Sequence, residues 1–135
     1  MRYPIHADLS IDLPDGWVEV DSDDDLILFV PADESIGAVT IEVLSRVGSG
    51  PPASSDGIGL IARFVEGFSD DDPIVETEVI GDCVRSSTSV VDREGLPWDV
   101  IARVSFDRAV VLSFVHLDES SPAVELARRD VASML

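Results

Sequence analysis

The residues best suited to chemistry are an acidic run, two histidines, one cysteine and several serines. The run Asp21–Asp25 begins like a calcium-binding EF-hand loop, because carboxylates stand at loop positions one, three and five. The sixth position, which must be Gly for the sharp turn, is Leu26, and the twelfth, which should be a bidentate Glu, is Ala32. We therefore interpret Asp21–Asp25, and similarly Asp70–Asp72, as solvated turns, with a loose divalent-cation site as the alternative.

The other reactive side chains lack the spacing of a catalytic or metal site. His6 and His116 are far apart and form no zinc pattern with Cys83. We expect His116 to be half-buried where a strand meets its exit loop, and Cys83 to be a small core residue. The serines around Ser87 have no nucleophile-elbow context, and a chain without Lys has no phosphate-binding Walker loop. We predict that the chain is not an enzyme and uses no metal or cofactor.

The charge restricts the class of partner. The chain has 135 residues, with 27 acids against nine bases that are all Arg, and a formal net charge of −18. Such a field repels phosphate backbones and anionic lipid, so nucleic acid and membranes are poor partners. Two explanations of the acidity remain open: a compositional background from a GC-rich or salt-adapted genome, and a negative surface that steers a basic partner.

The start of the chain and its single cysteine predict the compartment. Met1–Asp8 holds a base and an acid but no apolar run of a secretory signal, and no stretch reaches the roughly 18 apolar residues that span a bilayer. Cys83 has no second cysteine for an internal disulfide. We expect a cytoplasmic protein.

Hydrophobic periodicity predicts the elements that must position these side chains. Short β-branched runs bounded by turn residues indicate strands at 7–13, 17–20, 26–30, 38–44, 74–80, 83–91, 98–106 and 109–117. A helix capped by Ser55 or Asp56 carries an apolar stripe at helical spacing: Ile58, Ile61, Phe64, Val65 and Phe68. A last helix begins at Pro122, after Ser121 as N-cap. Residues 109–115 are apolar on both faces, so that strand needs cover on both sides.

This order of elements predicts one domain over residues 1–135. The fold class is α+β, with a mainly antiparallel sheet of about six to eight strands covered by helices.

The segment from Leu9 to Trp17, a strand running into Pro-Asp-Gly-Trp, and the strand end Phe29-Val30-Pro31 resemble the PsbP-like fold group. This group includes Ran-binding Mog proteins, the PsbP proteins of photosystem II and bacterial DcrB/LpqN-type proteins. The match covers nearly the whole chain as an order of elements. It implies a PsbP-like α/β/α sandwich and a non-catalytic module that binds another protein or assists an assembly, and it carries over no catalytic residues.

Aromatic, acidic and loop residues are the candidates for partner binding. Trp17 and Trp98 each stand beside a turn, where they either close the core or anchor a partner. Residues 47–56 form the longest irregular stretch, and such loops often carry function. The candidate partner-binding residues are Trp17, Trp98, Asp23, Asp24, Asp25, Ser49, Pro51 and Pro52.

Three functions remain open. The first is a non-enzymatic accessory module whose acidic face engages a basic protein, for example an immunity protein that neutralises a basic toxin. The second is a small-ligand carrier or small enzyme with a pocket between the sheet and the middle helix. The third is a structural subunit or homodimer built through an uncovered sheet face or edge.

Overall fold

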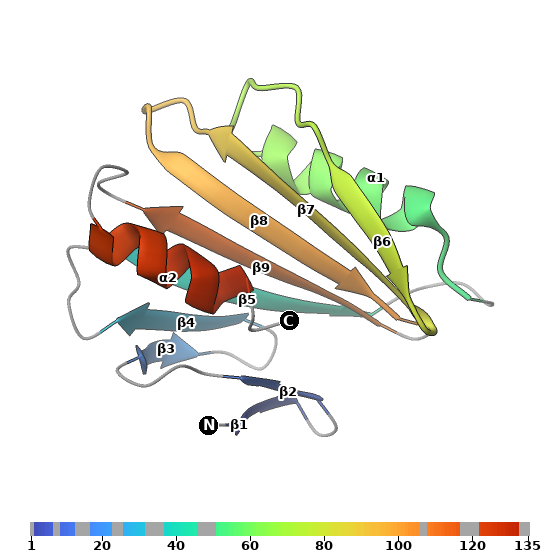
Figure 1. The fold of residues 1–135 in the computed structure, drawn as a ribbon, viewed down its shortest axis with the longest axis horizontal. Helices are drawn as coiled ribbons and strands as arrows, with labels where there is room; N and C mark the ends of the chain where they lie inside the picture. Colours follow the sequence, from blue (N-terminus) through green and yellow to red (C-terminus); the bar gives the residue numbers. More distant parts are fainter. Residues whose placement is uncertain are drawn as a thin grey trace.

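A computed structural model describes residues 2–6, 9–12, 17–22, 26–31, 37–45, 51–105, 108–116 and 122–132. Figure 1 shows an open, twisted sheet with helices packed on its two sides. The predicted α+β class, with an antiparallel sheet and two helices, is confirmed.

Among the described residues, seven strands form the main sheet in the order β3-β4-β5-β9-β8-β7-β6, and each neighbouring pair is antiparallel. A separate ribbon pairs β1 with β2. The strand bounds are β1 Arg2–His6, β2 Leu9–Asp12, β3 Trp17–Ser22, β4 Leu26–Pro31, β5 Gly37–Ser45, β6 Glu76–Ile80, β7 Cys83–Val91, β8 Pro97–Val104 and β9 Arg108–His116.

The sequence did not predict β1. Proline has no backbone N–H to donate, so Pro4 in the sequence argues against a regular strand at residues 2–6. In the structure Pro4 pairs with Ser10, and a register shift follows between Pro4 and His6. The irregular pairing of a short two-stranded ribbon accommodates the proline.

Helix α1, Ser54–Glu66, packs on one face of the sheet, against β6, β7 and β8. Ala53 is the N-cap instead of the predicted Ser55 or Asp56, and the Asp56 carboxylate accepts a hydrogen bond of 2.7 Å from the Ala53 N–H. The buried core on this face consists of Ile61, Val65, Val90, Val100, Ala102 and Val111. Phe64 and Phe68 pack against this core, as predicted, but Ile58 remains 42% exposed.

The glycine at position 57 accounts for the exposure of the Ile58 side chain at the surface of α1. Gly57 is the buried residue at the start of α1, and a Cβ built on it would overlap Ser86 Oγ and lie 3.1 Å from Ser86 Cβ. The absence of a side chain at Gly57 therefore lets the helix backbone approach β7 closely. The next residue, Ile58, is turned away from the sheet.

Helix α2, Pro122–Ala132, covers part of the opposite face and begins at the predicted proline. The core beneath it combines residues of both helix and sheet: Ile11, Trp17, Val39, Ile41, Val43, Ile101, Val110, Leu112, Phe114, Ala127 and Val131. Strand β9 lies between β5 and β8 and is buried on both faces, which confirms the prediction that it needs cover on two sides.

The two halves of the sheet differ on the α2 face. Over β5 and β9 this face is apolar and forms part of the core beneath α2. Over β6, β7 and β8, strand alternation places polar side chains on the same face, among them Glu76, Arg85, Ser87 and Asp99. The fold therefore leaves a polar half-face beside α2.

Candidate functional site

Trp98 is partly buried and packs against the buried core beneath α1, which we call the α1 core. Its ring centroid lies 4.6 Å from that of Phe68, and its indole N–H donates a hydrogen bond of 2.8 Å to the Asp92 carboxylate. The ring is packed and the polar N–H is satisfied, so the geometry fits the core-closing interpretation that the sequence left open.

Trp17 belongs to the core on the α2 face. It is 8% exposed and meets Phe114 edge to face, with ring centroids 6.1 Å apart. This packing also fits core closure and leaves little indole surface for a partner.

Of the other predicted binding residues, Pro51 is exposed and Pro52 is half-buried, just before α1. Asp23, Asp24, Asp25 and Ser49 lie outside the described residues.

Asp92 organises the turn between β7 and β8. Its carboxylate accepts hydrogen bonds from the Trp98 indole at 2.8 Å and from the backbone N–H groups of Leu96 and Glu94 at 2.9 Å. Gly95 has a φ of 89°, which a side chain would strain, and closes the turn. The hydrogen bond from Trp98, followed by that from Leu96, lowers the pKa of Asp92 below its ordinary value of 3.8.

Asp92→Asn is expected to reduce stability in a pH-dependent way. Because the pKa of Asp92 is lower in the folded state, its stabilisation is present above the unfolded-state pKa and is lost as pH falls through the folded-state pKa. The difference in free energy of unfolding between wild type and variant should therefore shrink as urea titrations move from about pH 6 toward about pH 2.5. Glu94→Gln, which removes a charge from the same turn, is the control, and an equal pH dependence in both variants contradicts the assignment.

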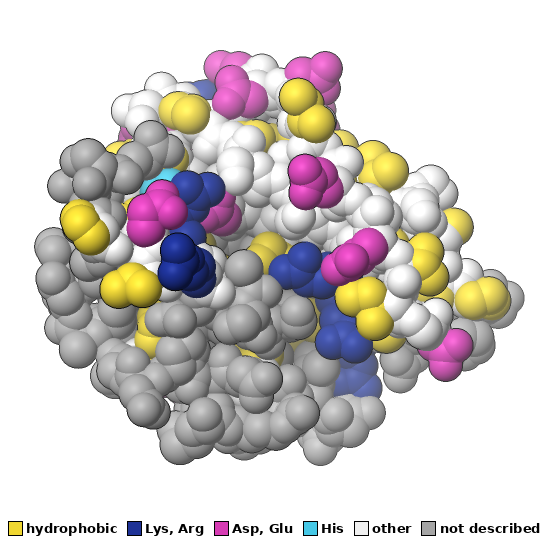
Figure 2. Space-filling view, viewed as in Figure 1, with side chains coloured by type: hydrophobic (Ala, Val, Ile, Leu, Met, Phe, Trp, Pro, Cys, Tyr) yellow, Lys and Arg dark blue, Asp and Glu magenta, His cyan; other side chains and the backbone are white. Residues whose placement is uncertain are grey.

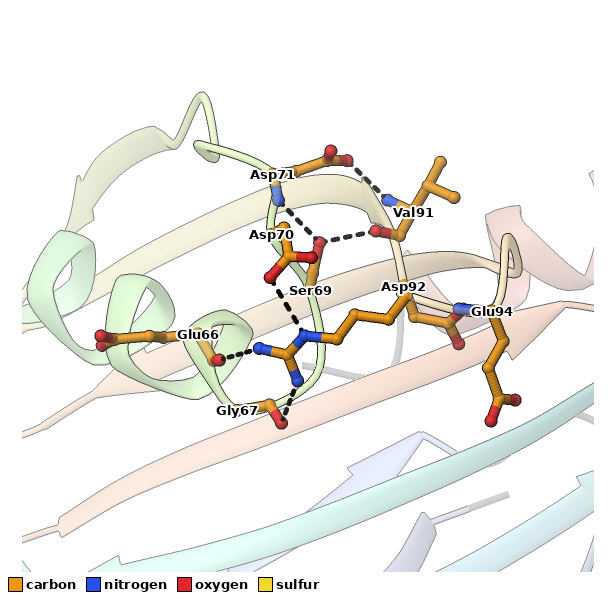
Figure 3. A network of polar contacts seen from close by, with 9 residues as sticks. Glu66, Gly67, Ser69, Asp70, Asp71, Val91, Asp92 and Glu94 are labelled. Atoms are coloured by element: carbon orange, nitrogen blue, oxygen red, sulfur yellow. Dashed lines mark hydrogen bonds and ion pairs between the residues drawn. The ribbon is translucent and has the colours of Figure 1, made fainter.

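A polar network joins the end of α1 to this turn (Figure 3). The Arg93 guanidinium donates to the backbone carbonyls of Glu66 and Gly67 at 3.1 and 3.3 Å, and to the Asp70 carboxylate at 3.0 Å. Ser69 Oγ donates to the Val91 carbonyl at 2.6 Å. Cations stabilise the C-terminal end of a helix, so this network has a structural role in fixing α1 on the sheet.

Asp99 is the centre of a Ser–Asp–His cluster. It accepts hydrogen bonds from Arg128 at 2.7 and 3.0 Å and from Ser89 at 2.7 Å, and it lies 3.5 Å from His116 Nε2. Nucleophile activation needs the imidazole between the serine and the carboxylate. Here the carboxylate lies between serine and histidine, so the cluster has the wrong order for a triad.

Two sequence predictions about reactive residues are corrected. His116 is 1% exposed instead of half-buried, because strand alternation turns it under the α2 face beside Phe114, with ring centroids 5.2 Å apart. Cys83 is only partly buried, since it lies at the start of β7, where its Sγ is 3.8 Å from an Arg103 nitrogen. Within the residues that the structure describes, no cluster of His, Cys, Asp and Glu could hold a metal ion.

Strand β6 presents an acidic edge. It is the last strand of the sheet, and among the described residues no other strand pairs with its outer side. Glu76 and Glu78 are exposed, as are the preceding Asp70–Asp72 and Asp82 in the following turn. Exposed apolar side chains lie between these carboxylates: Ile74 is 86% exposed, Val79 65% and Ile80 46%. We call Asp70–Asp82 the acidic edge.

The edge strand is held to β7 from the α1 face. Thr77 and Ser86 share a hydrogen bond of 2.9 Å between their hydroxyls, and Thr88 Oγ1 donates to the Ile74 carbonyl at 2.9 Å. These contacts fix β6 in register with β7, so its outer side is a preformed strand edge. The sequence signal for this feature was the alternation of Glu with Thr, Val and Ile over residues 76–80.

A groove lies on the polar half-face, between α2 and strands β6, β7 and β8. Its volume is about 710 Å³. Charged side chains in its lining include Arg85, Arg128, Arg129, Glu76, Asp99 and Glu125. The interface between the sheet and the middle helix, where a ligand pocket was placed as an alternative, is instead filled by the α1 core.

Comparison with known proteins shows a fold similarity. No protein-family model matches the sequence, and no curated protein matches it. A crystal structure of a protein from Bacteroides thetaiotaomicron VPI-5482 is similar, with a TM-score of 0.53 and 16% sequence identity. The similarity covers 93% of this chain and 43% of that chain, so this chain spans less than half of that protein's length. At this identity the similarity shows the fold alone.

Neither of the described helices is long and apolar enough to cross a membrane.

Proposed function

We propose that the chain is a non-enzymatic binding module that engages a basic, extended segment of a partner protein along the acidic edge. The observation that carries the proposal is the combination, on β6, of an outer strand edge with exposed carboxylates and apolar side chains. An edge strand can add a strand from another chain, with main-chain hydrogen bonds for affinity and side chains for specificity.

The geometry of the β6–β7 hairpin identifies the backbone groups that would pair. Ile80 pairs with Cys83 across the two-residue turn of Gly81 and Asp82, and Gly81 has a φ of 59°. Residues that close such a turn exchange both hydrogen bonds with each other, and the pattern then alternates. The N–H and C=O groups of Thr77 and Val79 therefore point outward, whereas those of Glu78 and Ile80 point to β7.

The charges on the edge favour a basic partner over a second copy of the chain. If β6 paired antiparallel with itself, Glu76 and Glu78 would face the same carboxylates on the copy. Like charges opposite each other destabilise a strand pair, and the net charge of −18 opposes association of two copies. A segment with Lys or Arg at alternate positions would instead place opposite charges beside these glutamates.

The non-enzymatic part of the proposal is supported by the order of the Asp99 cluster, in which the carboxylate separates Ser89 from His116. An immunity protein that neutralises a basic toxin is one version of this function. Helices on opposite faces of an antiparallel sheet are also compatible with the proposed PsbP-like sandwich.

A small-ligand carrier is a second candidate, because the groove beside α2 has the volume and converging polar groups of a ligand site.

Binding of a synthetic strand peptide tests the proposed function. The probe alternates Lys with Val and Thr, and its counterpart has Glu in place of Lys. By fluorescence anisotropy, the full chain should bind the basic peptide, with an affinity that falls as salt rises, and should not bind the acidic peptide. Glu76→Lys should weaken binding by about tenfold, because one favourable charge contact becomes repulsive.

The matched control is Glu94→Lys, which changes the net charge equally at an exposed position in the β7–β8 turn. This variant should bind the basic peptide within about twofold of wild type, since its charge lies outside the edge. Equal weakening by the two variants would mean that only the overall field attracts the peptide, and the proposed edge would then be wrong.

A further inference from the structure

Strand β6 presents different side chains to the two faces of the sheet. Glu76 and Glu78 are exposed on the α2 face. Thr77 and Val79 lie on the α1 face, where the Thr77 hydroxyl shares its hydrogen bond with Ser86. Figure 2 looks onto the α2 face and shows acidic side chains among hydrophobic ones over the β6 end of the sheet. A strand added to β6 would therefore meet two carboxylates on one face and none on the other.

The beginning of α1 lies over the β6–β7 pair on the α1 face. A Cβ on Gly57 would overlap Ser86 Oγ and lie 3.3 Å from Val84 Cγ1. Ser86 and Val84 are the cross-strand partners of Thr77 and Val79. Figure 1 shows α1 behind β6, with the N-terminal end of the helix visible beyond the outer side of the strand. An added strand would therefore run in front of this part of α1.

The side chain of Ile58 is turned toward the same outer side. Phe64 and Phe68 contact each other, and the Phe68 ring lies 4.6 Å from Trp98, so this side of α1 faces β8. Ile58 lies about 120° around the helix from Phe64, which is the side of β6, because β7 separates β6 from β8. Ile58 is 42% exposed and Val79 is 65% exposed. We call these two apolar side chains the α1 shelf.

The backbone of β6 determines which residues of an added strand would face the shelf. Every pair of neighbouring strands in the described sheet is antiparallel, and antiparallel pairing is slightly more stable than parallel pairing. In this pairing, residues that exchange hydrogen bonds with Thr77 and Val79 lie directly opposite them and point to the α1 face. The residues between them lie opposite Glu76 and Glu78 and point to the α2 face.

The α2 face of β6 suits long cationic side chains. Glu78 lies 4.0 Å from Arg85, whereas Glu76 forms no ion pair with any residue that the structure describes, so Glu76 offers the less compensated charge. Ile74 and Ile80 flank the two glutamates on this face and are 86% and 46% exposed. Lys and Arg pack their aliphatic stems on such apolar surface while the charged group reaches a carboxylate.

We infer that the partner segment is an amphipathic strand, antiparallel to β6, whose hydrogen-bonding residues are apolar and pack on the α1 shelf. The residues between them are Lys or Arg and face Glu76 and Glu78. The inference rests on the proposed function, because it assigns the orientation and the side-chain pattern of the partner at the same edge. Apolar contact with the shelf supplies affinity that exposed ion pairs alone do not give.

Backbone N-methylation of the probe peptide tests the orientation, because a methyl group replaces one N–H and blocks strand pairing on that side. Two versions of the Lys/Val/Thr peptide are compared by fluorescence anisotropy with the full chain. Methylation at the Val and Thr nitrogens should weaken binding by at least about tenfold, since these N–H groups donate to the Thr77 and Val79 carbonyls. Methylation at the Lys nitrogens, which point to solvent, should change the affinity by less than about threefold.

Ile58→Ala tests the shelf with the unmethylated peptide. It should weaken binding by about threefold, because the partner loses apolar contact while the helix keeps a residue of high propensity. Leu126→Ala is the matched control: Leu126 is 60% exposed on α2, so its truncation should leave the affinity unchanged.

The outcomes separate this inference from the function on which it rests. If the unmethylated peptide does not bind, the proposed function is wrong and the inference falls with it. If that peptide binds and methylation at Lys is the more damaging change, or if Ile58→Ala has no more effect than Leu126→Ala, the binding edge remains and the assigned orientation is wrong. Equal weakening by the two methylated peptides contradicts one-sided strand pairing and overturns both.

Discussion

Phe114→Ala is expected to lower the free energy of unfolding by about 3–5 kcal/mol, the usual cost of truncating a fully buried aromatic side chain. Phe114 has no exposed surface and lies on β9, between β5 and β8. Its ring contacts Trp17 edge to face and lies beside His116. The truncation would leave a cavity in the core that holds α2 on the sheet.

Urea unfolding followed by tryptophan fluorescence measures this effect, because Trp17 lies against the substituted ring. Leu126→Ala on the outer surface of α2 is the control, since Leu126 is 60% exposed and its truncation should cost less than about 0.5 kcal/mol. Similar losses in the two variants are incompatible with a core centred on Phe114.

Gly57→Ala and Gly59→Ala are expected to change stability in opposite directions, although both residues lie in the first half of α1. Alanine is favoured over glycine inside a helix by about 1 kcal/mol. A Cβ at Gly59 meets nothing within 4 Å, so Gly59→Ala should gain about that amount. A Cβ at Gly57 would overlap Ser86 Oγ, so Gly57→Ala should instead lose about 1–3 kcal/mol.

A second substitution isolates the cause of the Gly57 effect. Adding Ser86→Gly to Gly57→Ala removes the two Ser86 atoms that the new methyl group would meet, and leaves Val84 Cγ1 at 3.3 Å. Relative to Ser86→Gly alone, Gly57→Ala should then cost less than it does in the wild type, as measured by thermal or urea unfolding. Destabilisation that is unchanged in the Ser86→Gly background, or stabilisation by Gly57→Ala in the wild type, contradicts the close approach of α1 to β7.

Local patterns predicted most of the elements because their signals lie within a few residues. The alternation in residues 83–91 predicted β7, and Pro122 predicted the start of α2. The Asp92 turn is also local, since its carboxylate binds groups four and six residues later. The combination of Asp92 with Gly95 is a turn signal between the predicted strands 83–91 and 98–106, but it does not reveal the hydrogen bonds of the turn.

The candidate sites could not be predicted in this way because they join distant residues. Asp99 and Arg128 are 29 residues apart, and β5 meets β9 with Gly37 paired to His116. The groove had one local signal, the polar alternation of Arg85, Ser87 and Ser89 on a strand whose opposite face is buried. That signal does not show that α2 stops beside these side chains and leaves them uncovered, because helix placement depends on tertiary packing.

Amide hydrogen exchange of β6, measured by NMR on the full chain with and without saturating basic strand peptide, tests the proposed binding edge most directly. The account predicts that exchange of the Thr77 and Val79 amides slows by at least about tenfold when the peptide is bound, because their N–H groups then enter a new strand ladder. The amides of Glu78 and Ile80, already directed to β7, should change much less. Unchanged exchange at Thr77 and Val79 in the bound state, or protection confined to another part of the chain, would contradict the account.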